Sequence, residues 1–418
     1  MSTALFVIGL LSLLGTVSAL IGARRLSFFM PIYFLASWLQ GELAPWHLIW
    51  QSIVGLYLIS NGALEQNNGQ LGLLFLVLSF AGLVYLIGRA KKSELAFKQA
   101  LTHALGDDYL ADISPDRQQY LKQKIDSSAW LKPFSMKRDG VKRIANISYG
   151  DAGVRNLLDI YQPEKSREGG FPVLLQIHGG AWIIGHKKQQ ALPLINHMAE
   201  RGWLCVDINY RLSPKSRFPD HIIDVKKAIS WVKEHIADYG GDPNFIALTG
   251  GSAGGHLSSL ATLTPNFADF QPGFEDKDTT VQAAVPFYGV YSWEADDSIK
   301  GTEDIREFVA QRILPECDLP SESPWLAKGS PVNYVREDAP PMYFIHGDYD
   351  ALALVEGARK IASDLRAVSR APVAYAEIPG AQHAFDIFHS IRCDNAVLSV
   401  CEFLEWSHGN HQKNTPDQ

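Results

Sequence analysis

Long apolar runs occupy residues 1–90. Residues 3–22 form an uncharged apolar run that is long enough to cross a bilayer as a helix, and two further runs without Lys, Arg, Asp or Glu cover 43–60 and 71–88. A shorter apolar stretch, 28–39, contains a proline and is predicted to be re-entrant or interfacial. Runs spaced this closely do not fit a soluble fold. The pattern therefore predicts a transmembrane helical region of about three spans.

Basic residues follow the first and the last of these runs, and they are Arg24, Arg25, Arg89, Lys91 and Lys92. The loop between the second and third runs has no basic residue. Cytoplasmic loops carry an excess of Lys and Arg, so both basic clusters are placed in the cytoplasm. An even number of crossings must then separate them, which three spans satisfy. The sequence predicts a multi-pass cell-membrane protein whose N-terminus lies outside and whose remainder after residue 90 is cytoplasmic.

The pattern changes twice after the membrane region. Residues 91–140 are polar and mostly helical in pattern, which predicts a linker or a cap. In 141–408 short β-rich runs alternate with amphipathic helices, and 409–418 form a polar tail. The predicted strands are Leu157–Tyr161, Pro172–Ile177, Leu204–Ile208, Phe245–Leu248, Ala283–Phe287, Met342–Ile345 and Val373–Ile378. This alternation predicts an α/β fold, a mostly parallel sheet flanked by helices, with its chemistry at the carboxyl ends of the strands.

Composition and charge exclude several classes of protein. The formal net charge of −7 gives no reason to expect a nucleic-acid partner. Four cysteines in 418 residues are too few for a disulfide scaffold and are expected to be reduced and buried. The chain has neither a CxxC pair nor an HExxH motif, so we expect no metal and no other cofactor.

The predicted strand ending at Leu248 runs into Gly250-Gly251-Ser252-Ala253-Gly254 and then into a predicted helix. This is G-x-S-x-G in the strand–turn–helix context that it requires. A Cβ at either flanking glycine would collide with the neighbouring strand or helix, and the turn lifts the Ser252 hydroxyl clear of the sheet. The helix dipole behind Ser252 favours negative charge that develops there. Ser252 is therefore predicted to be a nucleophile.

A second glycine loop follows the predicted strand that ends at Ile177. It reads His178-Gly179-Gly180-Ala181-Trp182, and its glycines allow backbone N–H groups to point into a cavity. The N–H groups of Gly179 and Gly180, with that of Ala253 after the nucleophile, are predicted to form an oxyanion hole. His178 is expected to brace this loop rather than to act as a base.

A serine nucleophile needs a base and an orienting carboxylate, in the chain order Ser, acid, His. The predicted strand 342–345 runs into His346-Gly347-Asp348-Tyr349-Asp350, where Asp350 is the predicted acid and Asp348 the second choice. The strand 373–378 is followed by His383, the predicted base. Three other histidines are set aside, because His389 is expected to be helical and His408 and His411 to lie in or beside the polar tail.

With these residues identified, residues 156–406 resemble the hormone-sensitive-lipase-like and formamidase-like (feruloyl-esterase-like) branch of the α/β-hydrolases. The shared segments are HGGAW at 178–182, DINYRLSP at 207–214, GGSAGG at 250–255, HGDYD at 346–350 and GAQHAF at 380–385. In this branch Asn209, Tyr210 and Arg211 would brace the oxyanion loop. Gly251 departs from the acidic residue that hormone-sensitive-lipase-type enzymes have before the nucleophile, which favours the formamidase-like and feruloyl-esterase-like relatives.

The resemblance implies an α/β-hydrolase fold and the cleavage of a small or lipid-like carboxylic ester through an acyl-enzyme. Amide hydrolysis, as in an arylformamidase, and acyl transfer are the alternatives within this chemistry. A non-catalytic ligand-binding protein is the alternative from another class, and the presence of His383 counts against it. Trp182, Phe287 and Tyr288 are candidates either for pocket walls or for buried core aromatics, and 292–329 is a candidate part of a lid. The N-terminal helices resemble those of membrane-associated bacterial carboxylesterases, and they need not take part in the chemistry.

Overall fold

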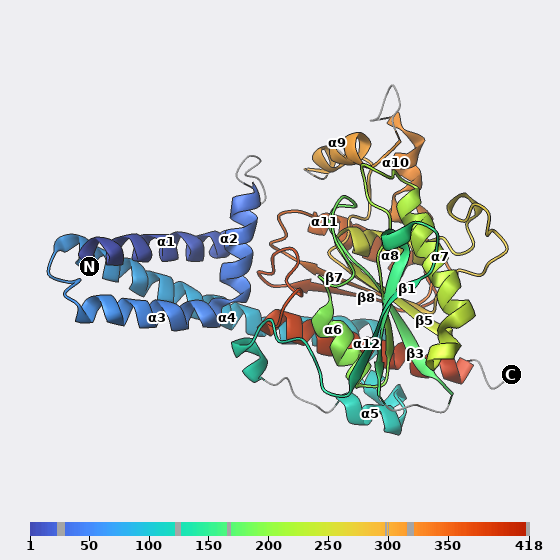
Figure 1. Ribbon diagram of the computed structural model, residues 1–418, viewed down its shortest axis with the longest axis horizontal. Helices are drawn as coiled ribbons and strands as arrows, with labels where there is room; N and C mark the ends of the chain where they lie inside the picture. The colour runs from blue at the N-terminus through green and yellow to red at the C-terminus, as the bar shows by residue number, and fades with distance from the viewer. Residues whose placement is uncertain are drawn as a thin grey trace.

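The computed structural model describes residues 1–22, 30–121, 127–164, 169–296, 299, 301–315 and 322–414. It places a helical N-terminal region beside an α/β domain (Figure 1). Arg24, Arg25 and one of the four cysteines, Cys317, lie outside the described residues.

Four helices make up the N-terminal region, and they are α1 (Ser2–Leu20), α2 (Met30–Glu42), α3 (Ala44–Ser60) and α4 (Asn67–Leu105). Helices α1, α3 and the first part of α4 run side by side, whereas α2 crosses their ends next to the α/β domain (Figure 1). Helix α4 has 39 residues and continues without a break into the α/β domain, where it packs against α12 (Ile391–Asn414) and β8 (Val373–Ile378). The boundary predicted at residue 90 therefore lies within a single helix.

Small and polar residues hold the N-terminal helices together. A Cβ at Gly72 of α4 would lie 2.5 Å from the Phe6 nitrogen of α1, so the two backbones are in close contact. Hydrogen bonds also link all four helices: Thr16 Oγ1 lies 2.8 Å from Ser79 Oγ and accepts from Gln40, and the Ser79 hydroxyl donates to Gln51. Interhelical packing through small residues and buried hydroxyls is typical of helices that have no aqueous hydrophobic effect to drive their association.

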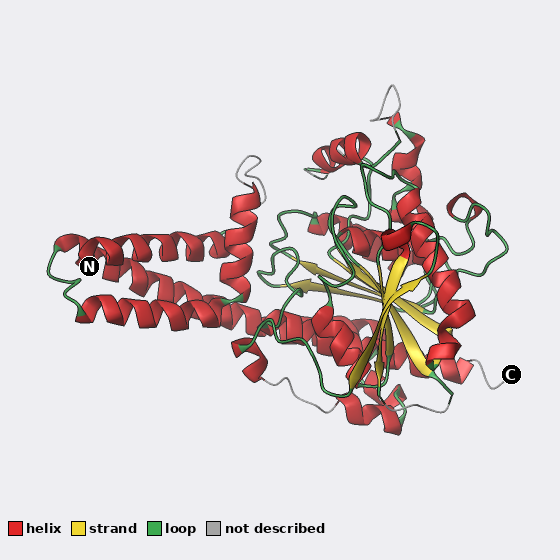
Figure 2. Cartoon of the chain, viewed as in Figure 1, coloured by secondary structure: helices red, strands yellow, loops and turns green. Residues whose placement is uncertain are grey.

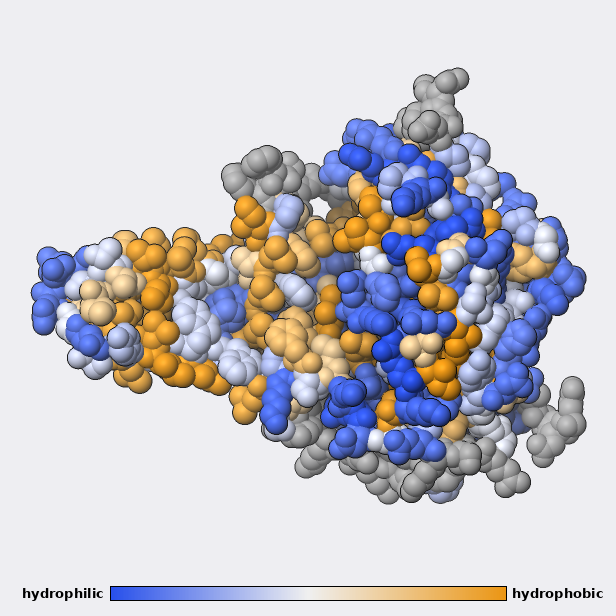
Figure 3. Space-filling model, in the orientation of Figure 1, coloured by the Kyte–Doolittle hydropathy of each residue, from blue (hydrophilic) through white to orange (hydrophobic). Residues whose placement is uncertain are grey.

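The outer surface of this bundle is apolar, with polar residues at its tip (Figure 3). Its exposed side chains include Leu11, Leu14, Ile53, Leu56, Val77 and Val84. Among the described residues, α1 and α4 are the helices long and apolar enough to cross a membrane, with mean hydropathies of 2.1 and 2.4 in their most apolar windows. Only 28% of each window is buried, whereas the core helix of a soluble protein would be mostly buried.

The α/β domain is built on one eight-stranded sheet with the order β1-β2-β4-β3-β5-β6-β7-β8. Its strands are β1 (Val141–Ser148), β2 (Leu157–Pro163), β3 (Phe171–Ile177), β4 (Leu204–Ile208), β5 (Gly241–Gly251), β6 (Ala283–Phe287), β7 (Met342–Gly347) and β8. The pairs β1–β2 and β2–β4 are antiparallel, and all other pairs are parallel. All seven predicted strands are present, and β1 is an additional edge strand.

Helices cover both faces of the sheet (Figure 2). Alternate residues of a central strand enter different cores. Val173 and Leu175 of β3 belong to one core with residues of α7 (Asp220–His235), α8 (Ala253–Leu263) and α11 (Val355–Val368), and Leu174 belongs to the other with residues of α6 (Leu192–Glu200), α12 and α4. Strands that are apolar on both sides are expected where helices cover both faces. The remaining described α-helices are α5 (Pro115–Leu121), α9 (Thr302–Arg312) and α10 (Pro324–Lys328).

The flanks of the domain are the segments predicted as a linker or cap and as a polar tail. The described part of 91–140 lies against α12, where Tyr109 and Arg117 bind Glu402 and Glu405. Residues 409–414, predicted as a polar tail, are the last turns of α12.

Candidate active site

Ser252 stands at the turn between β5 and α8 with φ 59° and ψ −121°. This left-handed φ is rarely adopted by a side-chain-bearing residue and marks a strained turn. A Cβ at Gly250 would lie 2.6 Å from the Ile177 carbonyl oxygen, and one at Gly254 would collide with the same carbonyl. The predicted steric need for both glycines is confirmed.

Gly251 has a neighbour that explains why it carries no side chain. A Cβ there would lie 2.6 Å from the hydroxyl oxygen of Tyr288. The Tyr288 hydroxyl donates a hydrogen bond to the buried Asp386. Tyr288 therefore occupies the space into which an acidic residue before the nucleophile would project.

His383 and Asp350 come together from the loops after β8 and β7. His383 Nδ1 lies 2.7 Å from Asp350 Oδ2, and both side chains are buried. Asp350 Oδ1 accepts the backbone N–H groups of Leu352 and Ala353, each at 2.8 Å. Burial alone raises the pKa of Asp350, but the neighbouring His383 and His346 outweigh it and hold that pKa well below its ordinary value. Asp350 is thus an anion fixed against the Nδ1 side of the His383 ring.

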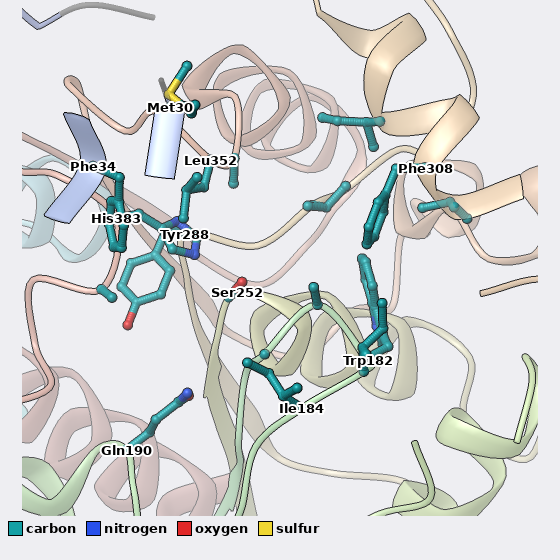
Figure 4. A pocket seen from close by; sticks show the side chains of 18 of the residues that line it. Met30, Phe34, Trp182, Ile184, Gln190, Ser252, Tyr288, Phe308, Leu352 and His383 are labelled. Carbon is teal, nitrogen blue, oxygen red and sulfur yellow. The ribbon is translucent and has the colours of Figure 1, made fainter. Parts of the chain in front are cut away.

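Ser252 and His383 line one cavity of about 880 Å³ (Figure 4). Its walls are mainly apolar and include Trp182, Ile184, Tyr288 and Phe308. A concave, mainly apolar cavity with a few convergent polar groups is the usual form of a small-molecule site. The arrangement places a serine hydroxyl, an imidazole braced by a carboxylate and an apolar compartment in one place.

The glycine loop after β3 differs from its prediction at one position. The Gly179 N–H donates to Gln190 Oε1 at 2.6 Å, so it is not free to bind an oxyanion in this structure. Gly180 and Ala181, with φ values of 119° and 51°, line the cavity together with Ser252. Gly180, Ala181 and Ala253 are therefore the better candidates for the oxyanion donors. The role of Gln190 was not predicted, because a contact between residues 11 positions apart leaves no local sequence signal. Ala181 lies in the predicted loop but was not predicted as a donor.

The four predicted support residues lie behind this loop. His178 is buried, stacks on Tyr210 at 4.3 Å, and its Nδ1 lies 2.8 Å from the Gly179 carbonyl oxygen. Burial lowers the pKa of His178 to about 4, so its ring is neutral at pH 7. The Tyr210 hydroxyl donates to the His178 carbonyl, Asn209 Oδ1 accepts the Lys187 N–H, and the Arg211 guanidinium binds Asp224. The contacts of His178, Tyr210 and Asn209 hold the loop and the residues that follow it, whereas Arg211 is held to α7 through Asp224.

The three candidate pocket walls divide into two groups. Trp182 and Tyr288 line the cavity, and the indole N–H of Trp182 donates to His256. Phe287 does not line it: its side chain lies in the core next to Phe385, and its carbonyl accepts the Ser252 N–H. Phe287 belongs to β6, whose residues are all buried, so of its two predicted roles the structure favours that of a core aromatic.

The remaining carboxylate and histidine candidates lie outside the cavity lining. Asp348 accepts the Gly380 N–H at 2.5 Å. His389 precedes α12 and is not helical, which corrects its prediction, and its Nδ1 lies 2.7 Å from Asp394. His408 and His411 lie on α12. Among the described residues, no group of His, Cys, Asp and Glu is arranged to hold a metal ion.

Two further helices, α2 and α9, also line the cavity. Met30, Phe34 and Trp38 come from α2 of the N-terminal region. Ile305 and Phe308 come from α9, within the segment predicted as a lid. The N-terminal region, which was predicted as a membrane region, thus also contributes side chains to the wall of the cavity.

Comparison with known proteins places this geometry in a family. Residues 158–365 match the BD-FAE family model. The chain carries a BD-FAE domain. The probable carboxylic ester hydrolase LipM of Mycobacterium tuberculosis is 51% identical over 261 residues, which cover 62% of this chain and 60% of LipM. Esterase LipQ of the same organism is 45% identical over 262 residues, covering 62% of this chain and 61% of LipQ. The chain thus spans about 60% of the length of these relatives.

Solved structures agree with the BD-FAE assignment. A truncated carbohydrate esterase from gut microbiota is 25% identical with a TM-score of 0.52, covering 65% of this chain and 99% of that chain. A thermophilic esterase from Thermogutta terrifontis is 26% identical with a TM-score of 0.51, covering 68% of this chain and 95% of that chain. Both matches support the α/β-hydrolase fold of the BD-FAE domain.

Proposed function

We propose that the protein is a serine hydrolase that cleaves carboxylic esters through an acyl-enzyme on Ser252. The observation that carries the proposal is the shared cavity. Ser252, at its strained turn, and His383 both line this one apolar compartment, and Asp350 binds His383 from behind. The esterase names of relatives up to 51% identical support the same chemistry.

The reaction follows from the roles of these groups. Ser252 Oγ attacks the ester carbonyl carbon while His383 Nε2 takes the hydroxyl proton, and Asp350 stabilises the imidazolium at Nδ1. The carbonyl oxygen becomes an oxyanion that accepts backbone N–H groups of Gly180, Ala181 and Ala253. Collapse breaks the ester C–O bond, and the alcohol leaves with the proton from His383. Water, deprotonated by His383, then attacks the acyl carbon and releases the carboxylic acid and free Ser252.

Ser252→Ala tests this proposal. The variant is expected to lose fluorophosphonate labelling and the hydrolysis of p-nitrophenyl butyrate while keeping the thermal stability of the parent protein. Ser258→Ala is a matched control, because that serine lies on the same helix but donates to the Gly255 carbonyl and does not line the cavity. Labelling that persists in Ser252→Ala would assign the nucleophile to another residue.

The N-terminal region is proposed to anchor the enzyme in the membrane by three spans, namely α1, α3 and the first part of α4. Helix α2 would then lie at the membrane surface on the side of the hydrolase domain. Three basic residues lie where α4 leaves the bundle for this domain, namely Arg89, Lys91 and Lys92. Because cytoplasmic segments carry an excess of basic residues, their position favours a cytoplasmic active site. The N-terminus and residues 61–66 would face the opposite side.

Reporter fusions at residue 418 test the topology. A cytoplasmic domain predicts a fluorescent green fluorescent protein fusion and an inactive alkaline phosphatase fusion. An active phosphatase fusion would overturn the orientation, without bearing on the chemistry of Ser252.

A further inference from the structure

The short helix α2 has two different faces. Ile32, Leu35 and Leu39 point away from the hydrolase domain and are exposed by 68%, 49% and 37%. Phe34 and Trp38 point the other way and line the cavity that contains Ser252. Figure 4 shows Met30 and Phe34 beside His383 and Tyr288. One helix therefore presents an apolar face to the surroundings and another to the active site.

Specific contacts hold α2 against the loop that carries His383. The Trp38 indole N–H donates to the Ala384 carbonyl at 3.0 Å, and Gln382 Nε2 donates to Ser37 Oγ at 3.0 Å. These partners are the two neighbours of His383 in the chain. The Phe34 ring meets the His383 ring edge-on at 6.4 Å. The contacts fix α2 as part of the wall around the base.

A buried ion pair continues this contact at the end of the helix. Arg392 Nη1 lies 2.8 Å from Glu42 Oε1, and the Ser390 hydroxyl donates to Glu42 Oε2 at 2.8 Å. The side chains of Glu42 and Arg392 are exposed by only 2% and 0%. Separating this pair by moving α2 away would leave a buried charge without its partner, which is strongly destabilising. Helix α2 is therefore an integral part of the domain.

The rim of the cavity is an apolar surface, beside α2 and on the wall opposite α2 (Figure 4). Ile184, Leu352 and Phe308 line it and are exposed by 68%, 45% and 38%. With α2 at the membrane surface, a long acyl chain that leaves the bilayer along this surface would stay in apolar surroundings. The equilibrium population of an acyl chain in water falls about fourfold for each methylene that is exposed, so a route through water is strongly disfavoured for a long chain.

We infer that α2 forms the membrane-side wall of the acyl pocket, and that the substrate is an ester of a long acyl chain taken from the bilayer past Met30 and Phe34. The inference rests on the serine-esterase and membrane proposals above. It assigns Phe34 and Met30 as residues that determine acyl specificity, and it makes the N-terminal region part of the enzyme's binding site.

The first test is an acyl-length profile of the full-length protein in phosphatidylcholine nanodiscs. Phe34→Trp and Met30→Trp each add bulk to the cavity wall. Each is expected to lower the ratio of kcat/KM for p-nitrophenyl dodecanoate over that for the butyrate by at least about tenfold. Leu35→Trp makes a comparable change on the outward face of the same helix and should leave the ratio within about twofold of the parent value.

Fluorophosphonate labelling shows which variants are folded. If both lining variants are labelled and keep the parent ratio, or if Leu35→Trp lowers the ratio as much as they do, the assignment of α2 is overturned. If the parent protein is neither labelled nor active on the butyrate, it is the proposed esterase function that fails.

The second test concerns the route of the substrate. Nanodiscs that contain enzyme and dodecanoate ester at a fixed mole fraction are diluted in buffer, and the initial rate per enzyme is measured. A substrate taken from the same disc gives a rate that does not change on dilution. A rate that falls in proportion to the bulk ester concentration would refute entry from the bilayer.

Discussion

Two histidines of the domain have similar burial and a similar carboxylate partner, and comparing them gives the sharpest test of which one is the catalytic base. His383 and His389 are exposed by 6% and 3%, and each places Nδ1 2.7 Å from an Asp carboxylate, that of Asp350 or Asp394. Only His383 lines the cavity with Ser252. Replacing either histidine by Ala removes a buried ring and one charge-assisted hydrogen bond.

The loss of stability should therefore be similar in the two variants. A hydrogen bond to a charged group contributes about 1.5–3 kcal/mol, so both variants should melt at a lower temperature. The losses of activity should differ greatly. His383→Ala is expected to lower kcat by about 10⁴–10⁶-fold, because the serine loses its proton acceptor. His389→Ala should keep kcat within about threefold of the parent enzyme.

The assay is the hydrolysis of p-nitrophenyl butyrate below the melting temperature of both variants, with the folded fraction measured on the same samples. Normalising each rate to the folded fraction separates chemistry from stability. Equal normalised losses in the two variants, or a large loss confined to His389→Ala, would refute the assignment of His383 as the base.

Two further results are expected. Asp350→Asn should lower kcat about 10⁴-fold, because the amide disturbs the tautomer and orientation of His383, whereas Asp348→Asn should cost less than tenfold in the same ester assay. Burial lowers the pKa of His178 to about 4 and those of His221 and His256 to about 3. The unfolded chain therefore binds more protons below pH 6.5, and the melting temperature should fall from there towards pH 4, with His178 alone contributing roughly 3 kcal/mol. A melting temperature that stays constant over this range would contradict the neutral, buried state of these rings.

Much of the hydrolase domain could be predicted because its signals are local. The predicted strands are short apolar runs bounded by turns, and the bounds of β4, β6 and β8 agree with the sequence pattern residue for residue. The strand–turn–helix context of Ser252 is also local, since the flanking glycines are needed to clear a neighbouring strand. Chain order then selected Asp350 and His383, which the structure brings to within 2.7 Å of each other.

The parts that could not be predicted depend on contacts between distant residues. Gln190 takes the Gly179 N–H from 11 positions away along the chain, and the hydrogen-bonding state of a backbone amide leaves no trace in composition. Phe287 and Tyr288 are adjacent aromatic residues, and the sequence alone does not show which of them lines a pocket. Only the register of β6 shows that Phe287 enters the core while Tyr288 lies beside Gly251.

Hydropathy also could not show how α2 is used. An apolar helix between two candidate spans has the same composition whether it faces lipid, protein or a cavity, and α2 faces more than one of these. The informative residues are the polar ones, because Glu42 is a rare acid in the apolar region and its partner Arg392 is 350 positions away. An isolated carboxylate in such a setting must be paired to remain buried, so Glu42 implies a cationic partner even though the sequence does not identify it. With Arg392 as that partner, the N-terminal region and the hydrolase domain share a buried ion pair and a continuous helix, and they are best treated as one folding unit.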